Sequence, residues 1–432
     1  MTNKAYRVTR KIALAVLRHF PRLRWRVRNT YWSFRRKQYI SASKSITVEE
    51  KTILFESYSG RSYACSPRAI FEALCYDPRF TDWHFYWSFR NNRITNISID
   101  HILLAERAIL VERGTSQYFE VCAKATYWVV NTRMPEWIEP KSDQIYVQCW
   151  HGTPFKRLGL DMPDTAVAAL NTAKELGWRY QIDAQKWTYI LSPSAYCSEH
   201  LLTAFGVSTE TNCKVLEVGY PRNDVIVNTL KSVDLEISIK RIKEKLNIPN
   251  GKRVLLYAPT WRDSKYKSNY GYVMDNDLDF DLLQKRLSKE WIILLRTHYY
   301  IRNRFDLDRW NGFIIDVSSV NDINDLYVVA DALMTDYSSV LFDYSNSRRP
   351  LIFYFPDFKF YKNDLHGFYI DPAELPGDKC FSSEEVVEAI ESLDDWDKEF
   401  GENYREFRQR FCPMDDGLAA KRVVEQVFIH KI

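Results

Sequence analysis

The first 48 residues contain no Asp or Glu, although they contain thirteen Lys and Arg residues. The whole chain of 432 residues has 60 Lys and Arg against 56 Asp and Glu, a net charge of +4. Residues 49–432 therefore carry 47 basic against 56 acidic side chains, a net charge of −9. This asymmetry predicts a basic N-terminal arm, residues 1–48, ahead of an acidic globular body.

No run of the sequence approaches the ~20 apolar residues that a membrane-spanning helix requires. The longest run near the start, Ile12–Leu17, is far shorter, and it lacks the apolar core and cleavage site of a signal peptide. Hydrophobic residues make up 46% of the chain and charged residues 27%, which excludes disordered and collagen-like proteins. We therefore expect a globular protein on the cytoplasmic side of the membrane.

Cysteine is scarce, and the eight residues form no C-x-x-C pair. Scattered cysteines in a chain without a signal peptide indicate buried small side chains rather than disulfides or a zinc site. The glycine patterns of P-loop proteins, dinucleotide-binding dehydrogenases and α/β-hydrolases are also absent.

Four alternating carboxylates, Asp275, Asp277, Asp279 and Asp281, could suggest a metal. A calcium loop is excluded because its glycine and glutamate positions hold other residues. An Asp-x-Asp metal site is the alternative, but the segment follows a polar loop, so a solvated acidic helix start is favoured. We expect neither a metal nor another cofactor.

The basic arm also contains apolar and aromatic residues. Ile12, Val16, Leu17 and Phe20 follow helical spacing, and residues 23–34 interleave aromatic residues with arginines. Basic amphipathic segments bind anionic membrane surfaces, where each cation adds ~1 kcal/mol. Nucleic acid is the rival partner, and a solvated tail is the third interpretation. We favour the membrane surface because apolar residues alternate with the charges, and we expect no nucleic-acid partner.

From Lys51 onward, short apolar runs alternate with polar, helix-like stretches. The runs predicted as strands are Thr52–Phe55, Trp83–Trp87, Ala108–Val111, Tyr127–Val130, Gln144–Trp150, Tyr189–Ser192, Lys214–Val218, Arg253–Tyr257, Trp291–Arg296, Phe313–Asp316, Ala332–Thr335 and Pro350–Tyr354. Uniformly apolar runs are typical of parallel strands that helices cover on both faces.

We therefore predict an α/β protein with two Rossmann-like, doubly wound domains, residues 49–247 and 248–432. The boundary falls near Asn247–Lys252, after a charged helix at Val233–Leu246. Whether the last helix crosses back to the first domain is left open.

Ligands of doubly wound sheets bind where the strands end, so the residues that follow each strand are candidates for the site. His151 directly follows an apolar strand in W-H-G-T-P (150–154). An imidazole there can accept a proton at neutral pH. The alternative is a histidine that only fills space at a helix start.

The residues after His151 are predicted to form a turn and a helix. Gly152 allows close backbone approach to a ligand. Thr153 is predicted to cap the helix, with Pro154 at its first position. Lys156 and Arg157 are candidate contacts for phosphate or for an acceptor.

Three further strand ends carry cations. Arg222, in G-Y-P-R-N-D (219–224), is a candidate anion contact after a turn. Arg262 and the pair Arg296 and His298 follow buried strands, and such side chains can bind a pyrophosphate without a glycine loop. A surface pair is the alternative for each of them alone.

The strand that ends at Thr335 runs into Asp336, Tyr337, Ser338 and Ser339, and the next residues have a helical pattern. Hydroxyls and free backbone N–H groups at a helix start form an anion site. A simple helix cap is the alternative, but a cap needs only one serine. This segment is the strongest local indication of a phosphate site.

Six motifs occur together in one order: W-H-G-T-P (150–154), G-Y-P-R-N-D (219–224), A-P-T-W-R-D (258–263), R-T-H (296–298), D-Y-S-S-x-x-F-D (336–343) and G-F-Y-I-D-x-x-x-L-P-G (367–377). The set resembles the CDP-glycerol:glycerophosphotransferase family, the teichoic acid primases and polymerases of Gram-positive bacteria. The resemblance covers roughly residues 120–390 and leaves out residues 1–48.

The resemblance implies a GT-B fold, in which two Rossmann-like domains face a cleft. It implies transfer of a polyol phosphate from CDP-glycerol to a hydroxyl of a lipid-linked glycan, with release of CMP and without a catalytic metal. The enzyme is then a peripheral protein at the cytoplasmic face of the plasma membrane.

The resemblance also implies roles for individual residues. His151 and His298 are the catalytic pair, with His151 as the base on the acceptor hydroxyl, although which histidine is the base is left open. The residues that bind the CDP donor and its phosphates are Arg262, Arg296, Thr260, Asp336, Ser338 and Ser339.

Other functions fit the same fold. A donor such as CDP-ribitol, or a nucleotide sugar, is the nearest alternative. A non-catalytic GT-B scaffold is a further one, although the intact His151, Arg296, His298 and Ser338 argue against it.

Overall fold

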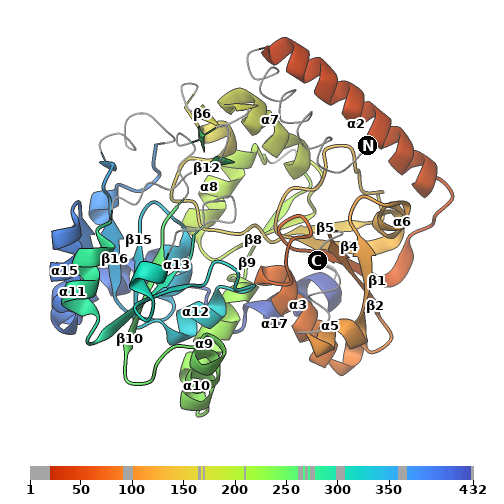
Figure 1. The fold of residues 1–432 in the computed structure, drawn as a ribbon. Coiled ribbons are helices and arrows are strands. Elements are labelled where there is room, and N and C mark those ends of the chain that lie inside the picture. Colours follow the sequence, from red (N-terminus) through yellow and green to blue (C-terminus); the bar gives the residue numbers. More distant parts are fainter. Residues whose placement is uncertain are drawn as a thin grey trace.

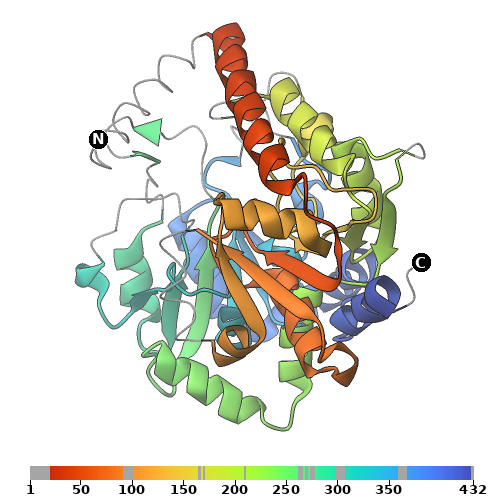
Figure 2. The ribbon, with the colours of Figure 1, turned by 90° about the vertical axis from the view of Figure 1, so that its right-hand side faces the viewer.

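The computed structural model describes residues 20–90, 101–163, 167–168, 171–208, 211–260, 266–267, 271–272, 278–297, 307–358 and 367–429. These residues form two parallel β-sheets with helices on their faces (Figures 1 and 2). Over the same residues, no helix has the length and apolar character needed to cross a membrane.

The first sheet has seven parallel strands in the order β3-β2-β1-β4-β5-β8-β9. The strands are β1 (Glu49–Glu56), β2 (His84–Phe89), β3 (Ala108–Glu112), β4 (Ala125–Val130), β5 (Ile145–Gln148), β8 (Tyr189–Ser192) and β9 (Lys214–Glu217). Alternate residues of a strand face opposite sides. Ile53 and Phe55 accordingly lie in one core and Leu54 in the other.

Helices cover both faces of this sheet. The core that contains Ile53 includes residues of α3 (Cys65–Tyr76), α5 (Ile102–Arg107), α17 (Ala419–Val423) and the π-helix Val424–Ile429. The core that contains Leu54 includes residues of α2 (Pro21–Ser43), α6 (Ser116–Lys124), α7 (Ala173–Ala184) and α8 (Ala195–Phe205). The end of the described chain therefore packs on the first sheet.

The second sheet has six parallel strands in the order β14-β13-β10-β15-β16-β17. The strands are β10 (Arg253–Ala258), β13 (Trp291–Leu295), β14 (Ile314–Asp316), β15 (Ala332–Thr335), β16 (Leu351–Tyr354) and β17 (Asp378–Cys380). Its core includes residues of α9 (Asp224–Lys231), α11 (Phe280–Leu287), α12 (Asn324–Val329), α13 (Val340–Ser345), α15 (Ser383–Glu391) and α16 (Trp396–Phe411). Two short antiparallel ribbons, β6-β7 (Val167–Ala168, Asn171–Thr172) and β11-β12 (Tyr266–Lys267, Gly271–Tyr272), lie outside both sheets.

All of the strands predicted from apolar runs are present, and the charged helix is α10 (Leu235–Lys245). The prediction missed β17, whose sequence Asp-Lys-Cys carries no apolar run. All eight cysteines are unpaired, and six of them are buried, as their spacing predicted. The domain boundaries stay a prediction.

Residues 21–43 of the basic arm form α2, which lies next to α6 (Figure 2). Arg24 pairs with Glu175 of α7 at 2.7 Å, and Arg36 pairs with Glu139 at 3.1 Å. Tyr39 is buried and donates to the carbonyl oxygen of Glu139. This part of the arm is thus a packed helix, and the solvated-tail interpretation is wrong for it.

The helix predicted after Thr153 is absent. Residues 153–158 are not helical, and Lys156 forms an antiparallel bridge with Phe368. The N–H of Arg157 donates to the carbonyl oxygen of Gly367, and the N–H of Tyr369 donates to that of Phe155. The prediction was wrong because Thr153 and Pro154 suit a helix start locally, whereas a segment more than 200 residues later pairs with this backbone.

Gly219 adopts a left-handed backbone (φ +86°), and a Cβ there would lie 2.3 Å from the carbonyl oxygen of Met414. We expect Gly219→Ala to lower the free energy of unfolding by about 2–4 kcal/mol. The new Cβ clashes with the carbonyl oxygen of Met414, and alanine is also strained in a left-handed backbone. Urea denaturation followed by circular dichroism measures this loss. Gly251→Ala is the matched control, since Gly251 has a similar φ (+77°) and open space around its Cβ. Equal losses in the two variants would contradict the role of the Met414 contact.

Candidate active site

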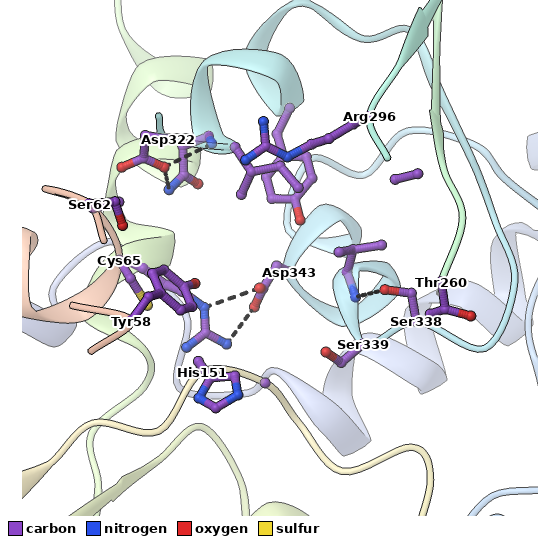
Figure 3. Close-up of a pocket in the computed structure, with 18 of the residues that line it drawn as sticks. Tyr58, Ser62, Cys65, His151, Thr260, Arg296, Asp322, Ser338, Ser339 and Asp343 are labelled. Atoms are coloured by element: carbon purple, nitrogen blue, oxygen red, sulfur yellow. Dashed lines mark hydrogen bonds and ion pairs between the residues drawn. The ribbon is translucent and has the colours of Figure 1, made fainter. Parts of the chain in front are cut away.

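A cavity of about 690 Å³ lies where the carboxyl ends of the two sheets face each other (Figure 3). The first sheet lines it with residues that follow β1, β5 and β9, and the second with residues that follow β10, β13, β14 and β15. This is the position predicted for the ligand of doubly wound sheets. Eleven of the thirteen predicted site residues lie in the described part of the chain, and Arg262 and His298 lie outside it.

His151 lines this cavity, and its Nδ1 lies 2.6 Å from the carbonyl oxygen of Asn131. A carbonyl oxygen only accepts, so Nδ1 carries the proton and Nε2 keeps its lone pair. Burial lowers the pKa of His151 to about 4, and the nearby cations Arg222 and Arg133 act in the same direction. The imidazole is therefore neutral at pH 7 and able to accept a proton.

Three residues around His151 have left-handed backbones although they carry side chains. They are Tyr58 (φ 49°), Cys65 (φ 65°) and Trp150 (φ 46°), and all three line the cavity. Such conformations cost about 1–3 kcal/mol each and persist where the surrounding structure imposes them. The ring centre of Trp150 lies 4.2 Å from that of His151 and the ring centre of Tyr58 lies 5.9 Å from it, so two of the three strained residues lie beside the imidazole.

Gly152 lies against Ser339 of the opposite sheet. A Cβ on Gly152 would lie 2.5 Å from the Ser339 Oγ. Gly152 was predicted to allow close approach to a ligand, which stays a prediction. The group that lies close to it in the structure is the side chain of Ser339, which follows β15. Gly152 therefore lets the His151 segment meet the D-Y-S-S segment.

The D-Y-S-S segment forms the wall opposite His151. Ser338 and Ser339 line the cavity, and Thr260 at the end of β10 lies beside them (Figure 3). Asp336 is buried, accepts the backbone N–H of Thr260 at 2.8 Å, and is not among the lining residues. Asp336 thus positions Thr260, while the two serines present hydroxyls to the cavity.

Arg296 lies at the end of β13 and lines the cavity. Its Nη1 donates to the carbonyl oxygens of Val317 and Val320, at 3.1 and 2.9 Å. The guanidinium therefore holds the loop after β14, whose residues 318–324 line the same cavity. Sequence reasoning placed a ligand contact here and did not predict this structural role.

Of the cations predicted to contact the acceptor or a phosphate, some line the cavity and one does not. Lys156 lines the cavity, as does Thr153, whereas Arg157 is exposed and does not. Arg222 also lines the cavity, but it is 5% exposed and forms a two-point ion pair with Asp343.

The lining residues that were not predicted as site residues include Tyr58, Asn324, Tyr327 and Asp343. Asp343 closes the D-Y-S-S-x-x-F-D motif, so its position was visible in the sequence although its role was not. The other three belong to no motif that indicates chemistry, and only the tertiary structure brings them to the cavity. In the part of the chain that the structure describes, no three or more His, Cys, Asp or Glu side chains are grouped to hold a metal ion.

The sequence profile of the family described as CDP-Glycerol:Poly(glycerophosphate) glycerophosphotransferase matches residues 38–429. The match is wider than the 120–390 estimated from the motifs, and it reaches into the basic arm.

Two curated relatives illustrate the similarity. The chain is 38% identical over 394 residues to the teichoic acid poly(glycerol phosphate) polymerase of Bacillus subtilis (strain 168), covering 91% of this chain and 50% of that protein. It is 36% identical over 377 residues to the teichoic acid glycerol-phosphate transferase of Staphylococcus aureus (strain NCTC 8325 / PS 47), covering 87% and 92%. It thus spans about half the length of the first relative. Ribitol-phosphate polymerases and a primase are 24% to 31% identical.

A solved structure of the wall teichoic acid polymerase TagF matches with a TM-score of 0.80 and 33% identity, covering 96% of both chains. The prediction of a GT-B fold is therefore confirmed. One solved TagF structure is a histidine variant soaked with CDPG.

The lowered pKa of His151 predicts an unusual pH dependence. The imidazole stays neutral until the pH approaches about 4, so kcat/KM should hold from pH 7 to about 5 and fall below that. An unperturbed histidine would instead produce an acid limb near pH 6.5. Initial rates over this range, at constant ionic strength, measure the limb. His84→Gln, at an exposed position, is the control, and a wild-type limb near 6.5 would contradict a neutral, buried base.

Proposed function

Because the chain belongs to the CDP-glycerol:poly(glycerophosphate) glycerophosphotransferase family, we propose that it transfers glycerol phosphate from CDP-glycerol to a hydroxyl of a lipid-linked glycan. The reaction belongs to teichoic acid synthesis and releases CMP. The observation that supports it best is the neutral, oriented His151, which lines the same cavity as Ser338 and Ser339.

The proposed chemistry follows from this arrangement. The acceptor hydroxyl attacks the β-phosphorus, and its proton passes to Nε2 of His151. The bond between the β-phosphorus and the bridging oxygen breaks, and this oxygen leaves with CMP. The barrier of phosphoryl transfer is lowered mainly by positioning and by stabilisation of charge, which hydroxyls and N–H groups of the D-Y-S-S segment can supply.

Further residues are assigned to the donor. We propose that Thr260, Ser338 and Ser339 contact the phosphates of CDP-glycerol, and that Arg296 acts through the loop after β14. Arg262 and His298 lie outside the described residues, and their contact with the donor phosphates stays a prediction. Lys156 and Thr153 are proposed on the acceptor side.

Glycerol is favoured over ribitol as the transferred polyol. The relatives named for glycerol phosphate are more similar to this chain than those named for ribitol phosphate. CDP-ribitol transfer by the same fold is the second candidate.

We expect purified protein to transfer label from CDP-glycerol to a lipid-linked acceptor at least ten times faster than from CDP-ribitol. His151→Ala should slow turnover ~10²–10⁴-fold, since it removes the base, while CDP-glycerol still binds. Scintillation counting of the extracted lipid measures transfer, and calorimetric titration measures binding. Equal use of both donors would favour the ribitol alternative, and an unchanged rate in His151→Ala would overturn the assignment of the base.

We also propose that α2 places the enzyme on the cytoplasmic face of the plasma membrane as a peripheral protein. Five large apolar side chains, spaced three or four residues apart, are about half exposed: Phe20, directly before α2, and Leu23, Val27, Tyr31 and Phe34 within it. Residues at this spacing share one face of a helix. A neighbouring face of α2, which includes Arg24 and Tyr39, packs on the body, so the apolar stripe with its basic neighbours stays exposed.

Removing this stripe should release the protein from anionic vesicles. We expect Val27→Glu with Phe34→Glu to weaken binding to phosphatidylglycerol vesicles at least ten-fold in cosedimentation, because both substitutions place charge at the acyl boundary. Ile237→Glu on α10 is the matched control, since Ile237 is also exposed. Unchanged vesicle binding in the double variant would contradict the membrane role of α2.

A further inference from the structure

Arg222 and Asp343 form a buried ion pair between the two halves of the molecule. Arg222 follows β9 of the first sheet, whereas Asp343 lies in α13 after β15 of the second. The Nε of Arg222 donates to Oδ2 of Asp343 at 3.0 Å, and its Nη2 donates to Oδ1 at 2.9 Å (Figure 3). The two residues are 5% and 8% exposed. A two-point pair of this kind fixes the plane of the guanidinium as well as its position.

Neighbouring groups leave neither partner free to turn. The Cζ of Arg222 lies 3.7 Å from the ring centre of Tyr220. The side-chain amide of Asn223 donates to Oδ1 of Asp343 at 3.1 Å, and it also donates to Asp415 at 2.6 Å. Both oxygens of Asp343 are therefore in use, and the guanidinium is held from its face and from one edge.

The other edge of the guanidinium has no partner. Its Nη1 is buried and makes no hydrogen bond among the described residues, although Arg222 lines the cavity. The hydroxyl of Tyr327, from α12, is likewise buried without a partner in the described part of the chain, and Tyr327 lines the same cavity. Unsatisfied buried donors carry a cost and are rare in native proteins, so a ligand that completes them explains their retention. Two N–H groups of a fixed guanidinium match the oxygens of a phosphoryl group.

We propose that Asp343 is a positioning residue whose carboxylate holds the free edge of Arg222 toward the cavity, where this edge donates to the phosphoryl group during its transfer. The inference rests on the proposed function, because it takes that anion from CDP-glycerol. Preorganised donors of this kind act where negative charge develops, and their removal lowers kcat more than it raises KM.

The two members of the pair also affect the pKa of His151. Arg222 and Arg133 lower the pKa of His151, and Asp343 raises it. With Asp343 present, its negative charge opposes the effect of the Arg222 cation on the pKa of His151. Without it, the cation would act on His151 unopposed, and Arg222 would be free to change its orientation.

The test uses the purified full chain with CDP-glycerol and a lipid-linked acceptor. Arg222→Lys keeps a cation beside Asp343 but loses the second edge, so kcat should fall ~10²-fold while KM for CDP-glycerol changes less than about three-fold. Asp343→Asn should lower kcat at least ten-fold with CDP-glycerol binding retained. Glu391→Gln is the matched control, since Glu391 forms a two-point pair with Arg286 at an exposed position, and its kcat should equal that of the wild type.

Chemical rescue separates positioning from simple loss of structure. Guanidinium ion, below the concentration that unfolds the protein, should raise the rate of the Arg222→Ala variant at least ten-fold, because Asp343 can hold the ion in place. It should restore none to the double variant Arg222→Ala with Asp343→Asn. Rescue of both variants, or a loss of rate that only follows the loss of folded protein in circular dichroism, overturns the inference.

Failure of the proposed function would look different. Wild-type protein that transfers nothing from CDP-glycerol would remove the premise. Wild-type transfer with full kcat in Arg222→Lys and Asp343→Asn would overturn the positioning role alone.

Discussion

The site depends on how two parallel sheets are joined across the cavity between their carboxyl ends. On one side, backbone hydrogen bonds tie Phe155 and Arg157 to Gly367 and Tyr369. On the other, the ion pair of Arg222 and Asp343 connects the residues after β9 to α13. Each connection joins segments more than 100 residues apart in the chain. Together they hold the segments after β5 and β9 against the second half of the molecule, where both segments line the cavity.

The polar interior of the cavity is compatible with folding because nearly every ionisable side chain described in it is either uncharged or paired with another group. Burial keeps His151 uncharged, and its proton is committed to a backbone carbonyl. Arg296 is bonded to carbonyl oxygens of a loop, and Arg222 to a carboxylate. Among the groups that line the cavity are the hydroxyls of Ser338 and Ser339, the imidazole of His151 and the guanidinium of Arg222. An anionic ligand with a hydroxyl beside it would satisfy that set.

Much of the fold could be predicted from local patterns. A parallel strand covered on both faces must be apolar along its whole length, and runs such as Trp291–Leu295 show this directly. The failures have one cause. A helix was predicted after Thr153 because Thr and Pro favour a helix start, and β17 was missed because Asp-Lys-Cys has no apolar signal. In both places the conformation is decided by a neighbouring strand or segment that is remote in sequence.

Local sequence patterns suffice to predict the parallel α/β class, the positions of the strands and the residues that follow them, since these depend on hydrophobic runs and short motifs. The same patterns identified His151, Ser338 and Ser339. They also predicted a basic, aromatic arm, but not which side of it packs on the body. The tertiary structure alone decided which nitrogen of His151 is free, that Gly152 makes room for Ser339, and that Arg222 is paired with Asp343. It also decided which face of α2 is turned outward. These properties depend on contacts between distant segments, and no local pattern encodes them.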